Sequence, residues 1–174
     1  FSNVFSLPQI CLSGEILRNE VLYKDGVYKI NSQAIIDASH DKVYKILTDY
    51  ENLTKLNPAI IESKLLKQDN KSIKLRTVTK DCVLFFCANI INTQVILYPS
   101  ENIIIAETIP EESNLESGKM KWHIVPSENK TLVNMEGNFK PSFWVPPIIG
   151  PIIIGSKIKN EAEISLKKVE EMVK

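Results

Sequence analysis

The stretch AIIDASHDKVYKILTDYENLTKLNP, residues 34–58, carries the change from a strand to two short helices. Its first residues end a segment in which apolar and polar side chains alternate, the period of a strand with one buried face. Val43 and Leu47 then stand about one helical turn apart, and Ser39 before them is a preferred N-cap residue. A second short helix must end before Pro58, because a residue that precedes proline avoids the helical region. The stretch therefore predicts a strand followed by two short helices.

A β-hairpin precedes this stretch. The dipeptide Asp25-Gly26 is a strong signal for a tight turn between antiparallel strands. Residues 15–24 and 27–36 are the two strands that this turn joins. Residues 1–26 are thus expected to supply an irregular arm and an extra strand.

Beyond residue 58, apolar segments and turn signals alternate along the chain, as in an antiparallel meander. The expected strands cover residues 59–67, 72–80, 82–98, 103–109, 119–125 and 131–139, with a polar loop at 111–118. Residues 147–173 instead repeat apolar side chains every three or four positions, the spacing of a long amphipathic helix. This helix remains to cover one apolar face of the sheet, so the sequence predicts an α+β fold with room for a cavity between the layers.

The composition indicates one domain with a balanced surface charge. The chain has 174 residues, of which 44% are hydrophobic and 24% charged, with 21 basic and 21 acidic side chains. One domain of residues 1–174 is expected at this length. Zero net charge argues against a nucleic-acid partner, because phosphate binding needs clustered Lys and Arg. The most apolar segment, residues 143–158, is interrupted by prolines and glycines and predicts no membrane span.

Few residues are suited to catalysis or metal binding. His40 starts the first helix and His123 falls on the outer face of its strand, so neither has partners at ligand spacing. Cys82 and Cys87 lie in the apolar run CVLFFC. On a single strand their odd separation directs them to opposite faces, which predicts that they do not bridge. We expect no catalytic residue, no metal and no cofactor.

Two segments resemble the START-like SRPBCC superfamily, in its polyketide cyclase/dehydrase and coenzyme-Q-binding branch. Residues 34–58 are similar to that branch in their strand, acidic cap, apolar helix, Thr-Asp-Tyr and closing proline. FWVPPIIG, residues 143–150, is similar in leading into the last helix. The resemblance covers residues 27–174 and implies the helix-grip fold, a curved antiparallel sheet wrapped around a long C-terminal helix. It also implies a hydrophobic cavity for a lipid, an isoprenoid quinone or a polycyclic compound.

The resemblance leaves three functions open. The first is non-catalytic binding or transfer of a hydrophobic small molecule, which the missing catalytic residues favour. The others are a polyketide cyclase/dehydrase-like enzyme and a protein-interaction module, since fold analogy indicates a ligand class and not a reaction. The hairpin strand resembles an extension of exported bacterial members, and the chain opens at Phe1. An exported or periplasmic location is therefore favoured over a cytoplasmic one.

Apolar side chains from two strands and the last helix are expected to face the cavity, although the same spacing fits a filled core. They are Met120, Trp122, Ile124, Val133, Met135, Phe139, Ile154, Ile158 and Ala162. Phe143 and Trp144 are expected to form a lid or a transient membrane contact. Arg76 is a candidate polar anchor for the ligand. Strand alternation puts it on the outer face, and only a bulge that inverts the register would bring it into the cavity.

Overall fold

The computed structural model describes residues 14–83 and 86–174, so residues 1–13 of the predicted arm lie outside the described part. In chain order the elements are β1 (Glu15–Lys24), β2 (Val27–Ile36), α1 (His40–Leu47), η1 (Tyr50–Lys55), β3 (Ile60–Gln68), β4 (Ser72–Val83), β5 (Phe86–Ser100), β6 (Ile103–Thr108), η2 (Pro110–Glu112), β7 (Leu115–Ser127), β8 (Lys130–Pro141) and α2 (Ile149–Val173).

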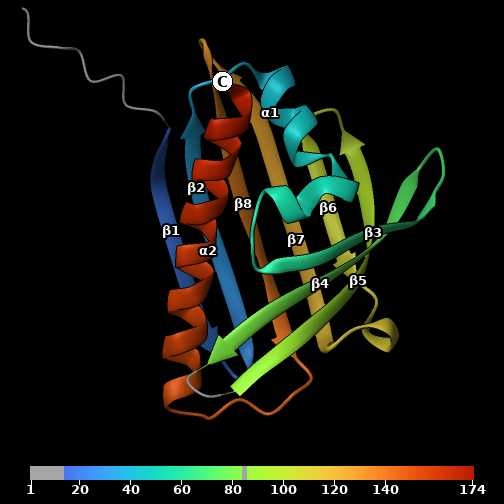
Figure 1. Ribbon diagram of the computed structural model, residues 1–174, viewed down its shortest axis with the longest axis vertical. Helices are drawn as coiled ribbons and strands as arrows, with labels where there is room; N and C mark the ends of the chain where they lie inside the picture. Colours follow the sequence, from blue (N-terminus) through green and yellow to red (C-terminus); the bar gives the residue numbers. More distant parts are fainter. Residues whose placement is uncertain (1–13, 84–85) are drawn as a thin grey trace, which may run out of the picture.

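The strands form a single antiparallel sheet in the order β1-β2-β8-β7-β6-β5-β4-β3. The sheet curves, and α1, η1 and α2 lie on its concave side (Figure 1). Helix α2 runs beside β1 and β2, where Asn19 Nδ2 donates a hydrogen bond to the Lys159 carbonyl oxygen at 3.1 Å. This arrangement confirms the predicted α+β helix-grip fold.

The N-terminal turn and the first helix form as the sequence predicts. Asp25 and Gly26 have positive φ angles of 52° and 83°, which the tight turn between β1 and β2 requires. Ser39 has the extended backbone of an N-cap residue, but its side chain makes no capping hydrogen bond within the described residues. Helix η1 ends at Lys55, before Pro58.

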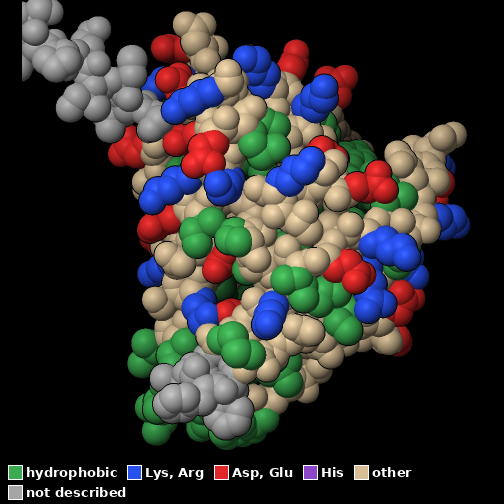
Figure 2. Space-filling model, in the orientation of Figure 1, with side chains coloured by type: hydrophobic (Ala, Val, Ile, Leu, Met, Phe, Trp, Pro, Cys, Tyr) green, Lys and Arg blue, Asp and Glu red, His purple; other side chains and the backbone are tan. Residues whose placement is uncertain are grey.

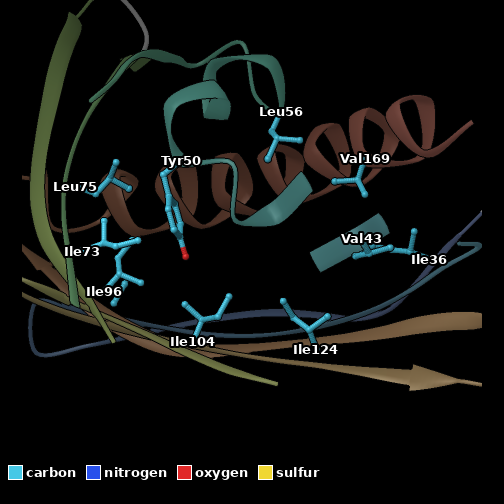
Figure 3. Packing of buried hydrophobic residues seen from close by; sticks show 11 residues of the cluster. Ile36, Val43, Tyr50, Leu56, Ile73, Leu75, Ile96, Ile104, Ile124 and Val169 are labelled. Atoms are coloured by element: carbon cyan, nitrogen blue, oxygen red, sulfur yellow. The ribbon is translucent and has the colours of Figure 1, made fainter. Parts of the chain in front are cut away.

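One half of the concave face is closed by α1, η1 and the end of α2. We call the buried cluster in this region the packed half, and it consists of Ile36, Val43, Tyr50, Leu56, Ile73, Leu75, Ile96, Ile104, Ala106, Ile124 and Val169. Figure 3 shows Tyr50 pointing from η1 towards the sheet, with Ile104 and Ile124 on the strands beneath. Full burial of one aliphatic side chain of this kind stabilises a fold by about 1.5–3 kcal/mol.

The hairpin between β4 and β5 corrects a prediction. Strand β4 continues to Val83 and β5 begins at Phe86, so Cys82 and Cys87 are direct cross-strand partners. Direct partners share one face of a sheet, and these two cysteines form a disulfide. The prediction that they do not bridge was wrong because it placed both on one strand. The apolar run CVLFFC contains no Gly, Pro, Asn or Asp to mark the reversal.

Strand β7 also differs from its predicted bounds. It begins at Leu115 and not at residue 119. The expected polar loop at 111–118 is therefore divided between η2 and the first residues of β7. Polar residues in this stretch concealed the strand, because they occupy its exposed positions.

Candidate functional site

The register of β7 and β8 decides which of their side chains face α2. Ile124 belongs to the packed half, so Trp122 and Met120, two and four residues earlier on β7, point to the same side. Val133 lies directly opposite Ile124, and Met135 lies opposite Trp122. The structure thus brings the predicted residues of these strands together on the concave face, as alternation indicated.

These side chains differ in how much of their surface is exposed. Ile124 is fully buried, whereas Met120 and Trp122 keep exposed surface although they face the helix layer. Helix α2 lies against β1 and β2 and so leaves the middle strands less covered. Figure 2 shows a hollow between α2 and β4, with hydrophobic side chains inside it and charged side chains at its rim. We call the half-buried set the open half of the concave face, and it consists of Met120, Trp122, Val133, Met135 and Phe139. Trp122 and Val133 of this set also pack against the packed half.

An aromatic stack bounds the open half towards β1 and β2. Phe139 pairs with Tyr28 across β8 and β2, and their rings stack with centroids 5.1 Å apart. Tyr23 adds a tilted ring at 4.9 Å from Tyr28. Burial raises the pKa of the Tyr28 hydroxyl to about 12. That hydroxyl has no hydrogen-bond partner among the described residues, so this wall presents mainly ring surface.

Uncharged polar side chains cross the concave face beside the open half. Ile96 of the packed half fixes their direction, because Gln94 and Asn92 precede it by two and four residues on β5. Thr77 lies opposite Asn92, and Thr108 lies opposite Gln94. Thr108 Oγ1 donates to Asn92 Oδ1 at 3.0 Å, and Asn92 Nδ2 donates to Gln94 Oε1 at 3.3 Å. We call these four residues, Thr77, Asn92, Gln94 and Thr108, the polar band.

The three predicted residues of α2 occupy the helix as expected. Ile154, Ile158 and Ala162 are half-buried. Val169, further along the same helix, is buried and belongs to the packed half. Helix α2 therefore passes from the packed half at its C-terminal end to the open half at its N-terminal end.

Two polar contacts join α2 to the β3–β4 side of the sheet. Lys157 Nζ pairs with the Asp81 carboxylate of β4, with both side chains about one-third exposed. Asn57, between η1 and β3, donates from Nδ2 to Ser165 Oγ at 3.2 Å. These contacts hold the helix across the concave face at two points.

Two tyrosine hydroxyls meet at the border of the packed half. Tyr98 Oη donates to Tyr50 Oη at 2.7 Å. Burial raises the pKa of Tyr50 far above its ordinary value. Burial also raises the pKa of Tyr98. Both hydroxyls therefore stay protonated at neutral pH and act as hydrogen-bonding groups without charge.

Arg76 lies outside this arrangement. It is paired with Thr93, one position from the concave-face pair Leu75 and Gln94, and no bulge interrupts the β4–β5 register there. Its Nε is 3.7 Å from a Glu62 carboxylate oxygen on the outer face. Its position therefore gives no support to the predicted role as an anchor inside the cavity.

Phe143 and Trp144 lie in the segment before α2, and both are exposed. Trp144 is 80% exposed, and Ile148 is 81% exposed. Ile149 and Ile152 on the first turn of α2 are exposed as well. We call these five residues the α2-start patch, which appears in Figure 2 as hydrophobic side chains at the lower end of the molecule. These five apolar side chains are therefore accessible to solvent at this end of the molecule.

Other candidate sites lie outside the open half. His123 is exposed and lines a polar groove of about 260 Å³ on the outer face. A second groove, of about 420 Å³, lies between Val21 of β1 and the start of α2. Within residues 14–83 and 86–174, no three His, Cys, Asp or Glu side chains are grouped to hold a metal. Over the same ranges, no helix is both long and apolar enough to cross a membrane.

Sequence reasoning missed the polar residues of the site. The helical spacing of residues 147–173 singled out the apolar positions and gave no role to Lys157 or Glu161. Their spacing of four residues, continued by Ser165, is the signal that they share one face of α2. The alternation of β5 likewise places Asn92 and Gln94 on the same side as Ile96, which could have identified the polar band.

Many solved structures resemble this fold, and three of them illustrate the likeness. A START superfamily protein from Mycobacterium smegmatis has a TM-score of 0.65 and 19% identity, covering 83% of this chain and 96% of that chain. An aromatase/cyclase from a Streptomyces species has a TM-score of 0.69 and 12% identity, covering 84% and 93%. A STAR-related lipid transfer protein from Xanthomonas axonopodis has a TM-score of 0.66 and 14% identity, covering 89% and 98%. At these identities the likeness shows the fold alone.

Sequence comparison identifies the family. No curated protein sequence matches this chain. A family model described as polyketide cyclase / dehydrase and lipid transport matches residues 28–173, which run from the second residue of β2 to the end of α2. Because this match spans most of the chain, the protein belongs to the polyketide cyclase / dehydrase and lipid transport family.

Proposed function

We propose that this protein binds a hydrophobic small molecule on the open half of the concave face and transfers it without chemical change. The single observation that carries the proposal is the partial exposure of Met120, Trp122 and Met135 beneath the helix layer. Apolar side chains that face inward but remain accessible gain free energy when an apolar ligand removes them from water. The family, whose members include lipid transport proteins, supports this ligand class.

The ligand class follows from the lining. Met and aromatic side chains dominate the open half, and thioether and ring surfaces adapt to ligands of varied shape. A lipid, an isoprenoid quinone or a polycyclic compound matches this lining. Hydrophobic pockets of this kind usually add a few polar groups that orient the ligand, a part that the polar band can take.

The α2-start patch is proposed as the contact with the membrane from which a lipid enters. Trp144 and Phe143 combine apolar bodies with the preference of aromatic residues for the bilayer interface. Flotation with phosphatidylcholine vesicles tests this step. We expect Trp144→Ser combined with Ile148→Ser to reduce the bound fraction, and equal flotation of the variant and the parent protein would contradict it.

Organic extraction followed by mass spectrometry tests the ligand proposal, with native mass spectrometry to give the stoichiometry. We expect one apolar molecule per chain after exposure to a lipid and quinone mixture. Met120→Glu places a carboxylate on the open half and should abolish uptake. His123→Glu places the same group on the outer, exposed face of β7 and should leave uptake intact. Uptake that both variants retain, or no uptake by the folded parent protein, would contradict the proposal.

A cyclase- or dehydrase-like activity is the second candidate. One observation favours it, namely that α2 directs an ionisable side chain, Glu161, towards the concave face. An acid or base inside the cavity is what proton transfer to a polyketide-like substrate requires. Turnover of such a substrate that disappears in Glu161→Gln would establish the enzyme, and unchanged substrate after prolonged incubation would exclude it.

A further inference from the structure

Three residues one turn apart on α2, Lys157, Glu161 and Ser165, share one face of the helix. The outer two both reach the β3–β4 side, since Lys157 pairs with Asp81 and Ser165 accepts a hydrogen bond from Asn57. Glu161 stands between them, so its side chain is directed into the same gap. This gap is the hollow between α2 and β4 that Figure 2 shows.

The Glu161 carboxylate lacks a donor. Its Oε2 atom is buried and has no hydrogen-bond partner among the described residues, although the residue as a whole is half-buried. Lys157, one turn away on α2, pairs with the Asp81 carboxylate, so it balances the charge of Asp81 and not that of Glu161. A buried acceptor without a donor is costly, and a buried carboxylate oxygen especially so. A ligand that donates a hydrogen bond at this point would remove the cost.

The opposite wall does not supply a compensating charge. The polar band consists of hydroxyl and amide groups, and Asn92 is already bonded to both Thr108 and Gln94. Arg76, the nearby arginine of β4, lies on the outer face beside Glu62. The interior therefore has uncharged polar groups at the polar band, apolar side chains on the open half, and a carboxylate at Glu161.

From this arrangement we propose that the cavity selects amphipathic ligands whose polar end donates a hydrogen bond to Glu161. Alcohols, phenols and amines with an apolar body meet this requirement. Carboxylates and phosphate esters of the same length do not meet this requirement. They would place a second negative charge beside the Glu161 carboxylate. The inference rests on the proposed function and deepens it, since it assigns the polar end of the ligand that the open half would hold.

Three probes of one chain length separate the alternatives, namely dodecanol, dodecylamine and dodecanoate, with affinities measured by native mass spectrometry and calorimetry. The parent protein should bind the alcohol and the amine about tenfold or more tightly than the acid, as expected for a hydrogen bond to a charged group. In Glu161→Gln the preference for the amine should fall by about tenfold, and dodecanoate should bind more tightly. Glu163→Gln removes an exposed carboxylate from the other side of α2 and should leave the order unchanged.

Ser165→Ala keeps Glu161 but removes the acceptor for Asn57, so it reports any general disturbance of α2. This variant should retain the preference of the parent protein. Binding of all three probes with an order that Glu161→Gln does not alter would overturn the inference alone. Binding of none of them to the folded protein would overturn the proposed function and the inference with it.

Discussion

The packed half and the open half of the concave face meet on β7 and follow the same strand alternation, yet they differ in what covers them. Leu75 and Ile124 are 0% exposed because α1 and η1 close over them. Trp122 and Met120, two and four residues before Ile124 on β7, remain partly exposed, because α2 lies against β1 and β2. An apolar inward face thus becomes a core or a binding surface according to the element above it. The comparison predicts that mutations in one half change stability, while mutations in the other change ligand binding.

The largest effect is expected at Leu75. Leu75→Ala leaves a cavity in the packed half and should lower the free energy of unfolding by about 3 kcal/mol. Urea denaturation followed by circular dichroism measures the change. Leu22→Ala, at a site that is 66% exposed on β1, is the matched control and should stay within about 0.5 kcal/mol of the parent protein. Equal midpoints for the two variants would remove the distinction between a packed and an exposed apolar residue.

The disulfide links β4 to β5 on the outer face of the sheet. Asp81, the residue before Cys82, lies on the concave face and pairs with Lys157 of α2. Replacement of both Cys82 and Cys87 by Ser should lower the free energy of unfolding by roughly 2 kcal/mol, the loop-closure contribution for so short a loop. The same denaturation assay measures it. The parent protein under reducing conditions should match the double variant, and a parent protein insensitive to reduction would contradict the disulfide.

Tyr50 links the packed half to Tyr98 and should cause a loss of stability at high pH. Burial raises its pKa above the usual value near 10, so only the unfolded chain releases this proton just above pH 10. Stability is therefore complete below pH 10 and falls as the pH rises above it. Tyr50→Phe should cost about 1 kcal/mol at pH 7 through the lost hydrogen bond and should make the alkaline decline shallower. Denaturation series between pH 7 and 11.5 test this, and an unchanged slope in the variant would contradict it.

Only a small change in stability is expected in the open half. Met120→Ala removes a half-buried side chain and should alter the free energy of unfolding by about 1 kcal/mol or less, well below the effect at Leu75. Its affinity for dodecanol should nevertheless fall, because the side chain contributes apolar contact to the ligand. A loss of stability as large as that of Leu75→Ala, with unchanged affinity, would mean that Met120 belongs to a filled core.

Much of the fold could be predicted from the sequence because its elements carry local periodicities. Alternation placed Met120 and Trp122 on the concave face, and helical spacing identified α2. The disulfide between Cys82 and Cys87 could not be found this way, because the chain reverses inside an apolar run without turn residues. Glu161 was missed for a different reason. Amphipathic spacing marks polar helix positions as solvent-facing, and only the contacts of its neighbours show which gap it enters.

The central claim, that a ligand occupies the open half, is tested most directly by the fluorescence of Trp122. The chain has two tryptophans, and Trp144→Phe removes the exposed one, so that the remaining emission reports the concave face alone. Titration of this variant with a bromine-substituted dodecanol should quench Trp122 saturably, with a plateau at one quencher per chain. Quenching that rises without saturation, at the rate seen for free tryptophan in solution, would contradict the account.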